Sequence, residues 1–521
     1  MLFNSLEFIF LFLPLTLVGF FHLGTRSQYH LALAWLLASA IFFYSWSNPT
    51  NVIVLLSSVL LNYGIGAVLN EQIHLAISKK VTLFIGVLLN LSFLGYFKYA
   101  NFFIETTNSL FDTNLYISKI ALPLGISFFT FQQIAYLVDS YRGETKSNYS
   151  FLHYATFVTF FPYLLAGPIN HHKAIITQFF DRTLYRLNLE NITIGITLFS
   201  LGLFKKVVLA DGVAPYANQV FTAASHQDVS LTLFEAWLGA LAYTLQLYFD
   251  FSGYSDMAIG IAKLFGIQLP INFNSPYKSL SIIEFWRRWH ITLSNFLRDY
   301  LYIPLGGNRK GEIRRNINLM ITMLLGGLWH GAGWSFVLWG GLNGVYLLIN
   351  HQWRSYRQRI WGQDLNPSPY WSRFLSGLIT FIAVVIGWVF FRARDMHTAW
   401  IMLQGMVRVQ GLDFTDLMPN LEIEIEQVED IYELDPLMLT LIIGGLLLIV
   451  WCLPNTQQWI GEHHLANHQQ QSAITNNAKP SQWCKKFYWQ PNQFWAVICA
   501  ILSVIALLNL VKVSEFLYFE F

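Results

Sequence analysis

The sequence has few charged residues and few cysteines. Lys, Arg, Asp and Glu make up only 12% of its 521 residues, against roughly 25% in an ordinary soluble domain. Because 54% of the residues are hydrophobic, these few charges cannot cover the surface of a soluble protein of this length. The three cysteines, Cys452, Cys484 and Cys499, have no paired spacing, so they indicate neither a disulfide framework nor a zinc site.

Several classes of function also lack their usual sequence signals. The net charge is only +2 and the basic residues are dispersed, so nucleic-acid binding is not expected. We find no Gly-x-Ser-x-Gly elbow, P-loop, dinucleotide-binding fingerprint or HExxH motif. His463, His464 and His468 lie in a stretch rich in Gln and Asn, which favours a solvated loop over a metal site. We expect no bound metal.

Long apolar segments recur along nearly the whole chain, and a helix needs about 20 apolar residues to cross a bilayer. They predict an all-α polytopic integral membrane protein, a single transmembrane domain over residues 1–521 with roughly 10 to 13 helices, spanning or re-entrant. The first segment lacks a positive n-region and a cleavage site, so we expect a retained span. The candidate spans are Leu6–Gly24, Leu31–Ser47, Val52–Leu69, Val81–Phe103, Ile117–Val138, Leu152–Ile169, Ile192–Leu209, Leu231–Phe251, Ile317–Trp329, Trp334–Asn350, Phe374–Phe391, Leu437–Trp451 and Phe494–Leu510.

Charged loops set the expected orientation. The positive-inside rule places the loop with Arg309, Lys310, Arg314 and Arg315 in the cytoplasm. Counting three spans forward, residues 411–436 contain Asp and Glu but no Lys or Arg, so they are expected to form an acidic periplasmic loop. Residues 456–491 then form a polar cytoplasmic loop.

His330 stands near the middle of a long uncharged stretch. No Asp, Glu, Lys or Arg occurs from Asn316 to Trp353, yet His330 lies there within LLGGLWHGAGWSFVLWGG. An ionisable residue in such a segment is costly and typically functional. The glycines after it predict a helix end, and a helix from Asn316 covers only about 21 Å. We expect His330 on the floor of a recess; a structural histidine bonded to Ser335 or to a carbonyl is the alternative.

A second histidine lies in SIIEFWRRWHITLSNFLRDYLYIPLGG, residues 281–307. The spacing of its apolar residues predicts an amphipathic helix at the cytoplasmic interface, carrying His290. A structural anchor is one explanation of its arginines. The functional explanation is a site for the phosphates of a donor such as coenzyme A. The candidate donor-binding residues are Arg287, Arg288, Arg309, Lys310, Trp286 and Trp289.

Two further polar inserts lie around residues 122–143 and 245–277. Helix caps and interhelical hydrogen bonds explain such polar groups most simply. The functional alternative is a substrate tunnel, because polar faces within apolar segments avoid lipid. The candidate tunnel-lining residues are Asp250, Ser252, Tyr254, Asn274, Gln132, Trp329 and Trp334.

Five strings of the sequence resemble the membrane-bound O-acyltransferase family, and most closely its bacterial alginate O-acetyltransferase branch. They are LPLGISFFTFQQIAYLVD, YFDFSGYSDMAIG, FWRRWHITLSNFLRDYLYIPLGG, LLGGLWHGAGWSFVLWGGLNG and WVFFRA. The resemblance covers Met1 to about Ala399. It implies a ring of helices thinned at its centre, with cytoplasmic and periplasmic cavities that meet near an essential histidine. That histidine matches His330, and a second family position, Asn in many lipid-acylating members, matches His290.

The resemblance also implies an activity. It implies an O-acetyltransferase of the bacterial inner membrane that takes acetyl from a cytoplasmic thioester, acetyl-CoA or an acylated carrier protein. The acceptor is an alginate-like exopolysaccharide or peptidoglycan, reached through a periplasmic partner of the SGNH-hydrolase type. His330 is expected to act as general base and His290 to orient the thioester; a covalent acyl-histidine step is the alternative. No bound cofactor is expected, because acetyl-CoA is a substrate.

Two functions of other classes compete with this expectation. A transporter or flippase for a polysaccharide precursor would use His330 as a proton relay. A scaffold for a periplasmic acetylase would need neither histidine. The acidic loop 411–436 is a candidate docking site for the partner, with a plain solvated loop as the simpler explanation. Membrane lipids are expected to surround the protein in every case.

Overall fold

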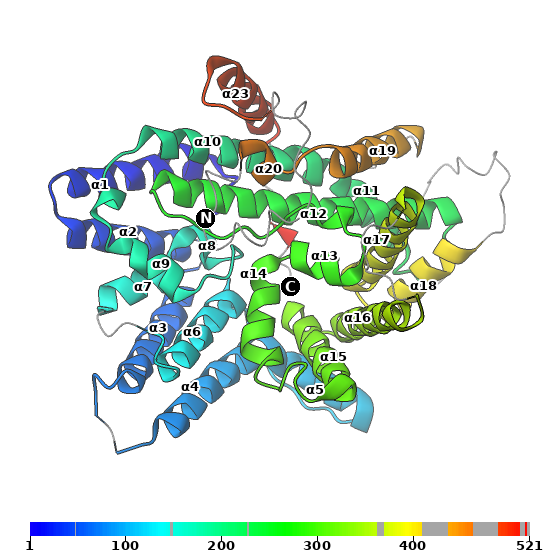
Figure 1. Ribbon diagram of the computed structural model, residues 1–521, viewed down its shortest axis with the longest axis horizontal. Helices are drawn as coiled ribbons and strands as arrows, with labels where there is room; N and C mark the ends of the chain where they lie inside the picture. The colour runs from blue at the N-terminus through cyan, green and yellow to red at the C-terminus, as the bar shows by residue number, and fades with distance from the viewer. Residues whose placement is uncertain are drawn as a thin grey trace. The chain divides into compact units, whose positions relative to one another are not determined.

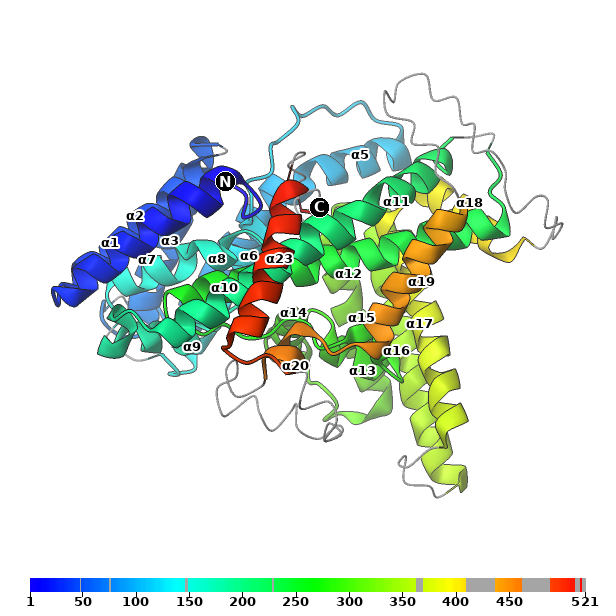
Figure 2. The ribbon, with the colours of Figure 1, turned by 90° about the horizontal axis from the view of Figure 1, so that it is seen from above.

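The computed structural model describes residues 1–46, 48–74, 76–145, 149–226, 229–361, 369–408, 436–461, 488–510 and 516–517. All regular secondary structure within these ranges is helical, as Figures 1 and 2 show, so the prediction of an all-α protein is confirmed. Residues 411–435 of the predicted acidic loop lie outside the described residues, as do residues 462–487, which contain Cys484 and the three histidines of the polar stretch.

Within the described residues, five helical segments are long and apolar enough to cross a membrane, and three shorter apolar helices accompany them. The multi-pass prediction is therefore confirmed. The five are Phe8–Thr25, Thr50–Leu69, Lys79–Phe111, Leu189–Ala223 and Tyr370–Arg392; the shorter three are Tyr29–Ser45, Leu437–Cys452 and Gln493–Leu508.

Two of the predicted spans are wrong in detail. The segment 117–138 becomes helical only from Ile126, where α6 (Ile126–Tyr141) begins. The segment 152–169 breaks into two short helices, α7 (Phe151–Thr159) and α8 (Phe161–Leu164), because Pro162 cannot continue a helix from the preceding turn. Almost every residue of both helices is buried inside the protein, so their apolar composition reflects the core and not contact with lipid.

The described chain forms two compact units. The first comprises residues 1–204, 252–272 and 456–521. Its core is aromatic: the Phe8 ring lies 5.0 Å from Phe3, 5.9 Å from Phe43 and 6.2 Å from Phe161, measured between centroids. Besides α6, α7 and α8, its elements are η1 (Phe8–Phe12), α1 (Leu13–Thr25), α2 (Tyr29–Ser45), α3 (Thr50–Leu69), α4 (Lys79–Leu94), η2 (Gly95–Tyr99), α5 (Ala100–Phe111), α9 (His172–Phe179), η3 (Arg182–Tyr185), α10 (Leu189–Phe204), α20 (Thr456–Ile460) and α23 (Gln493–Leu508).

The second unit comprises residues 205–251 and 273–455. It contains both candidate histidines and the arginines of residues 287–315. Helix α12 (Leu233–Leu264) contributes its first part to this unit and its second part to the other. The remaining elements are η4 (Lys205–Ala210), α11 (Asp211–Ala223), η5 (Pro276–Lys278), α13 (Ile282–Arg288), α14 (Ile291–Leu297), η6 (Arg298–Tyr302), α15 (Gly311–His330), α16 (Trp334–Trp361), α17 (Tyr370–Arg392), α18 (Met396–Val407) and α19 (Pro436–Cys452).

Helices α15 and α16 form a tight hairpin in the second unit. They cross where glycine faces glycine: a Cβ added at Gly327 would lie 3.0 Å from the Cα of Gly340, closer than an ordinary contact. Helix α15 ends at His330 because Gly331 has an extended backbone, with φ −159° and ψ 151°. The predicted start of this helix near Asn316 is wrong, since α15 begins at Gly311 and its 20 residues cover about 30 Å. The short-helix argument for a recess therefore fails.

Candidate active site

His330 is the last residue of α15 and is buried, with 5% of its surface exposed. Aromatic rings enclose its imidazole. The ring centroids of Trp329, Trp339 and Phe391 lie 4.8, 5.0 and 5.2 Å from it, and all three rings meet it edge to face. These rings come from α15, α16 and α17, so three helices hold this side chain.

His290 lies at a break in the chain and not within an amphipathic helix. Helix α13 ends at Arg288, α14 begins at Ile291, and His290 between them has a left-handed backbone, with φ 43° and ψ 55°. The side chain is completely buried. The predicted interfacial helix is therefore wrong: its apolar residues Phe285 and Trp289 are buried among other aromatic rings and do not face a membrane surface.

A left-handed backbone is unusual for a residue with a side chain. It costs about 1–2 kcal/mol for most residues, while His, Asn and Asp adopt it several times more often than others do. The break turns the chain so that the imidazole of His290 meets Phe251 edge to face, with 4.8 Å between centroids. Burial lowers the pKa of His290 to about 3, so its ring is neutral at physiological pH.

Trp329 joins the two histidines. Its ring lies 4.8 Å from His330 and 6.2 Å from His290 between centroids. The two residues, 40 positions apart in the sequence, therefore belong to one aromatic cluster of the second unit. Trp388 extends this cluster, stacking on Trp339 at 5.7 Å and contacting Trp289 at 4.8 Å.

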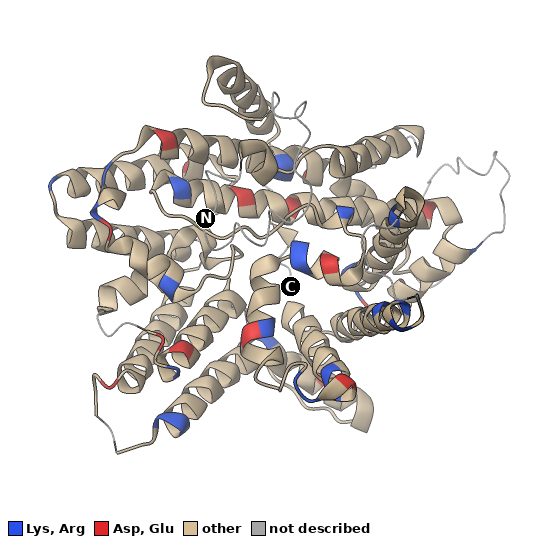
Figure 3. Ribbon diagram, in the orientation of Figure 1, with Lys and Arg blue, Asp and Glu red and all other residues tan. Residues whose placement is uncertain are grey.

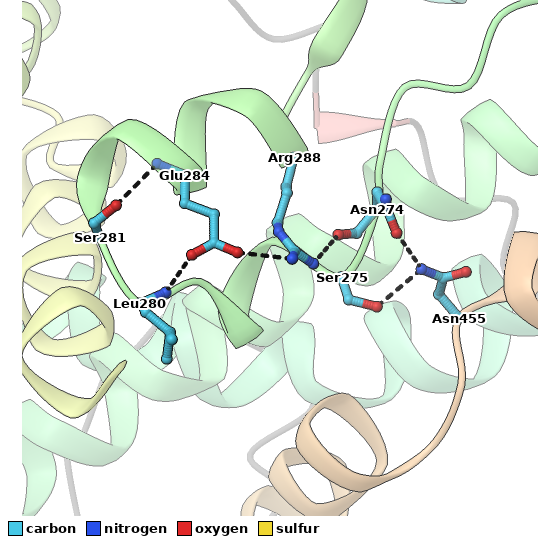
Figure 4. Close-up of polar contacts among 7 residues, drawn as sticks. All are labelled: Asn274, Ser275, Leu280, Ser281, Glu284, Arg288 and Asn455. Carbon is cyan, nitrogen blue, oxygen red and sulfur yellow. Dashed lines mark hydrogen bonds and ion pairs between the residues drawn. The ribbon is translucent and has the colours of Figure 1, made fainter. Parts of the chain in front are cut away.

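Polar contacts hold α13 to Leu280, Asn274 and Asn455 (Figure 4). Glu284 accepts a hydrogen bond from the backbone N–H of Leu280 at 2.9 Å and forms an ion pair with Arg288 at 2.7 Å. Arg288 also donates to the carbonyl oxygen of Asn274 at 3.3 Å, while Asn455 donates to the Asn274 side chain at 2.9 Å. Arg288 and Asn274, predicted to bind donor and to line a tunnel, thus hold α13 in place.

The other predicted donor-binding residues occupy two environments. Arg287, Arg309 and Lys310 are exposed. Trp286 is partly buried and meets Trp339 edge to face at 5.8 Å, and Trp289 is almost completely buried. The two tryptophans therefore belong to the aromatic cluster, whereas the three cations face outward.

The predicted tunnel-lining residues divide between the two units. Gln132, Ser252 and Tyr254 are buried in the first unit. Of the residues in the second unit, Asp250 is also buried, but Trp334 at the start of α16 is 54% exposed. The prediction that these residues line one tunnel stays a prediction.

A buried ion pair was not anticipated. Lys206, in the π-helix η4, places its Nζ 2.8 Å from Asp250 and 2.7 Å from Asp211. The side chains of Lys206 and Asp250 are each 2% exposed. The signal was present in the sequence: a lysine in an apolar segment needs a nearby acid, because an uncompensated buried charge is very costly. Asp250 therefore has a structural partner within its own unit.

Trp339, Trp388 and Phe391 were also missed. They lie in apolar segments whose aromatic residues serve equally well as lipid-facing or core positions. Their one signal in the sequence was that they fall within the strings LLGGLWHGAGWSFVLWGGLNG and WVFFRA, which carry the family resemblance. Within the part of the chain that the structure describes, no group of three His, Cys, Asp or Glu side chains could hold a metal ion.

The arrangement suits proton-transfer chemistry. A neutral imidazole can accept a proton through one ring nitrogen or donate a hydrogen bond through the other. The surrounding aromatic rings exclude water and lower the local dielectric, which strengthens any hydrogen bond made to a reacting group.

Comparison with known proteins adds the family context. The model of the membrane-bound O-acyltransferase family matches residues 38–391, a range that includes both histidines. The chain is 42% identical to the peptidoglycan O-acetyltransferase of Helicobacter pylori over 455 residues, which cover 82% of this chain and 84% of that protein.

Two other relatives carry related names. A probable alginate O-acetylase of Pseudomonas aeruginosa is 43% identical over 410 residues, covering 78% of this chain and 75% of its own. The teichoic acid D-alanyltransferase of Bacillus subtilis is 26% identical over 281 residues, covering 53% of this chain and 69% of its own. The resemblance drawn from the five sequence strings is confirmed.

Proposed function

Because the chain belongs to the membrane-bound O-acyltransferase family, we propose that it moves acetyl groups from a cytoplasmic thioester donor, acetyl-CoA, across the bacterial inner membrane for O-acetylation of an extracytoplasmic polysaccharide. The chain is a multi-pass membrane acyltransferase. The observation that carries the proposal is the aromatic cluster in which Trp329 contacts both His290 and His330.

In the proposed reaction His330 is the general base. Its imidazole takes the proton from the acceptor hydroxyl as that oxygen attacks the thioester carbonyl. The carbon–sulfur bond of the resulting tetrahedral intermediate then breaks, the acetyl group stays on the acceptor oxygen, and the thiolate recovers the proton from His330. His290 hydrogen-bonds the carbonyl oxygen as negative charge develops on it. Its neutral ring supplies a donor without placing a permanent cation in the site.

The names of the relatives support the class of acceptor. They name peptidoglycan and alginate as acetylated polymers. An acceptor hydroxyl on a periplasmic partner of the SGNH-hydrolase type, which then acetylates the polymer, is the form of the reaction that we propose. Membership of an acyltransferase family favours this activity over a flippase, which would move a precursor without acyl transfer, and over a scaffold.

The test is transfer of radiolabelled acetyl from acetyl-CoA to an extracytoplasmic acceptor, in membranes containing the native partner. We expect label with the wild-type protein and with the control variant His397→Ala, because His397 is exposed on α18. We expect none with His330→Ala once its folding has been verified. Equal labelling by His330→Ala would place the chemistry elsewhere, and no labelling by the wild type would refute the proposed donor.

A further inference from the structure

Arg392, the last residue of α17, carries a positive charge that no described acid neutralises. It forms no ion pair with a described residue, whereas Arg288 pairs with Glu284 and Arg298 with Asp299, both at 2.7 Å. Figure 3 shows how few charges the helices carry. A cation kept without an acid at the end of an apolar helix is costly, so it indicates either a ligand or a structural role.

The guanidinium group of Arg392 is held by residues of α11 and α12. Its Nη2 donates a hydrogen bond to the side-chain oxygen of Asn218 at 2.9 Å. The guanidinium carbon lies 5.8 Å from the centre of the Phe221 ring and 5.9 Å from that of Tyr243, which is the range of cation–π contacts. The Nε atom is buried and has no described acceptor. These contacts fix the guanidinium in place, but the described residues leave its charge uncompensated and most of its five N–H donors unused.

Arg392 lies beside the candidate active site. The preceding residue, Phe391, meets the imidazole of His330 edge to face, with 5.2 Å between centroids. His330 ends α15 and Arg392 ends α17, so this contact places both helix ends on the same side of the second unit. The positive-inside rule predicts that this side is extracytoplasmic, because Arg314 and Arg315 lie near the other end of α15. An acceptor that reaches His330 from outside can therefore also reach Arg392.

The chemistry of this position suits a carboxylate on a protein. A guanidinium is planar and donates two parallel hydrogen bonds to a carboxylate. Such bonds are stronger in surroundings of low dielectric, which the rings of Phe221 and Tyr243 supply. The two rings also meet each other, with 5.7 Å between centroids, so they are occupied by each other and by Arg392 and offer no platform for a sugar ring. An acidic side chain of a protein therefore fits better than a polysaccharide.

We propose that Arg392 binds a carboxylate of the protein that supplies the acceptor hydroxyl, and so brings that hydroxyl to the histidine site. This inference rests on the proposed function and adds a feature of the acceptor to it, an acidic residue near the hydroxyl that takes the acetyl group. A purely structural role, in which Arg392 only fastens α17 to α11 and α12, is the alternative. The phosphate of a lipid in the outer leaflet has the same oxyanion chemistry, and the tests separate the two sources.

The first test measures how Arg392 affects the use of the acceptor. Initial rates of labelled acetyl transfer are measured for the full chain in phosphatidylcholine nanodiscs at varied concentrations of the native partner. We expect Arg392→Gln to raise the KM for the partner at least about tenfold, as the loss of a charge-assisted hydrogen bond implies, and to keep kcat within about twofold of the wild type. Arg392→Lys keeps the charge without the planar fork and should give an intermediate KM. Arg394→Gln is the matched control, since Arg394 is exposed two residues further on and loses the same charge; it should behave as the wild type.

The second test uses a defined acidic probe and needs neither transfer nor the partner. Binding of the blocked dipeptides acetyl-Ser-Asp-amide and acetyl-Ser-Asn-amide, which differ by one carboxylate, is measured by ligand-observed NMR in the absence of donor. We expect the wild type to bind the acidic dipeptide at least about tenfold more tightly than the neutral one. Arg392→Gln should bind the two equally, and Arg394→Gln should keep the difference. The wild-type comparison and Arg392→Lys keep the test decisive if Arg392→Gln fails to fold.

Each other outcome overturns a specific statement. A lower kcat with an unchanged KM in Arg392→Gln rules out acceptor binding, because Arg392 then acts only by holding Phe391 and the histidine site. Equal affinity of the wild type for the two dipeptides refutes the carboxylate. If phosphatidylglycerol in the nanodiscs displaces the acidic dipeptide, the site belongs to lipid phosphate; if glucuronate binds more tightly than the dipeptide, it belongs to a sugar. A wild type that binds the acidic dipeptide through Arg392 but transfers no acetyl overturns the proposed function and leaves the carboxylate site standing.

Discussion

Replacing Gly340 by alanine tests whether the crossing of α15 and α16 holds the histidine cluster in its working geometry. A Cβ at Gly340 would lie 3.1 Å from the Cα of Gly327 and 3.1 Å from the carbonyl carbon of Met323, and would overlap the carbonyl oxygen of Met323. All of these atoms are backbone, so only a movement of one helix can relieve the contact. At the adjacent Gly341, a Cβ would meet only a Leu324 methyl group at 3.4 Å, and that side chain can adjust.

The expected size of the effect follows from this geometry. Carbon atoms pack at about 3.5–4.0 Å, so the two helices must separate by roughly 0.5–1 Å at the crossing. His330 and Trp339 lie on opposite helices with 5.0 Å between their ring centroids, so the same movement opens the aromatic cluster. A misplacement of about 1 Å can cost about 100-fold in rate. Overpacking costs about 1–3 kcal/mol of stability, partly offset by about 1 kcal/mol because alanine favours a helix over glycine.

We therefore expect Gly340→Ala to lose roughly 10- to 100-fold in acetyl-transfer rate while its stability falls by no more than about 2 kcal/mol. Gly341→Ala is expected to keep the wild-type rate. The assay compares initial rates of labelled acetyl transfer for the two variants and the wild type, alongside their thermal unfolding in the same detergent. Equal rates for Gly340→Ala and Gly341→Ala, with both proteins folded, would contradict the reasoning.

The remaining predictions concern the buried polar groups. Asp250→Asn removes one of the two acids paired with the buried Lys206, so we expect a loss of unfolding free energy, partly recovered when Lys206→Met is added. The loss should be smaller than the loss of about 3–5 kcal/mol caused by a wholly uncompensated buried charge, because Asp211 still lies 2.7 Å from Lys206; full stability of the single variant would refute this. His290→Asn should keep more folded protein and transfer activity than His290→Ala, because asparagine adopts the left-handed backbone more readily; the reverse order would show that the conformation is unimportant. Because the pKa of His290 is lowered to about 3 and an unfolded histidine titrates near 6.5, the unfolded chain takes up this proton first as pH falls. The contribution of His290 to the free energy of unfolding is constant above about pH 6.5 and is lost as pH falls toward 3, with about 2 kcal/mol lost by pH 5. The free energy of unfolding of His290→Asn should therefore depend less on pH between 7 and 5 than that of the wild type.

Much of the fold follows from local pattern. The apolar runs at residues 6–24, 52–69 and 374–391 each became a helix within a few residues of the expected bounds, because segment length and hydrophobicity are properties of the neighbouring residues alone. His330 was singled out from sequence, since an ionisable residue in an uncharged stretch is a local signal, and its catalytic role stays a prediction. The start of α15 was missed because Glu312 and Arg315 interrupt the apolar run without interrupting the helix.

Other features could not be found in that way. The break at His290 was hidden because Phe285, Trp289 and Phe296 repeat at intervals that suit an amphipathic helix, and only burial against other helices makes two short helices more stable than one. The roles of Arg287 and Arg288 differ for a similar reason. They are neighbours in sequence, but Arg288 forms an ion pair with Glu284, whereas the side chain of Arg287 is exposed.

The sequence by itself determined that this is an all-helical membrane protein, which family it belongs to and which histidine stands out, because each of these depends on the composition or order of nearby residues. Only the tertiary structure decided that Trp329 joins His290 to His330 and that Lys206 forms an ion pair with Asp250. These contacts join residues far apart in the chain, and their energies depend on distance, burial and the surrounding charge, none of which is a property of a short stretch of sequence.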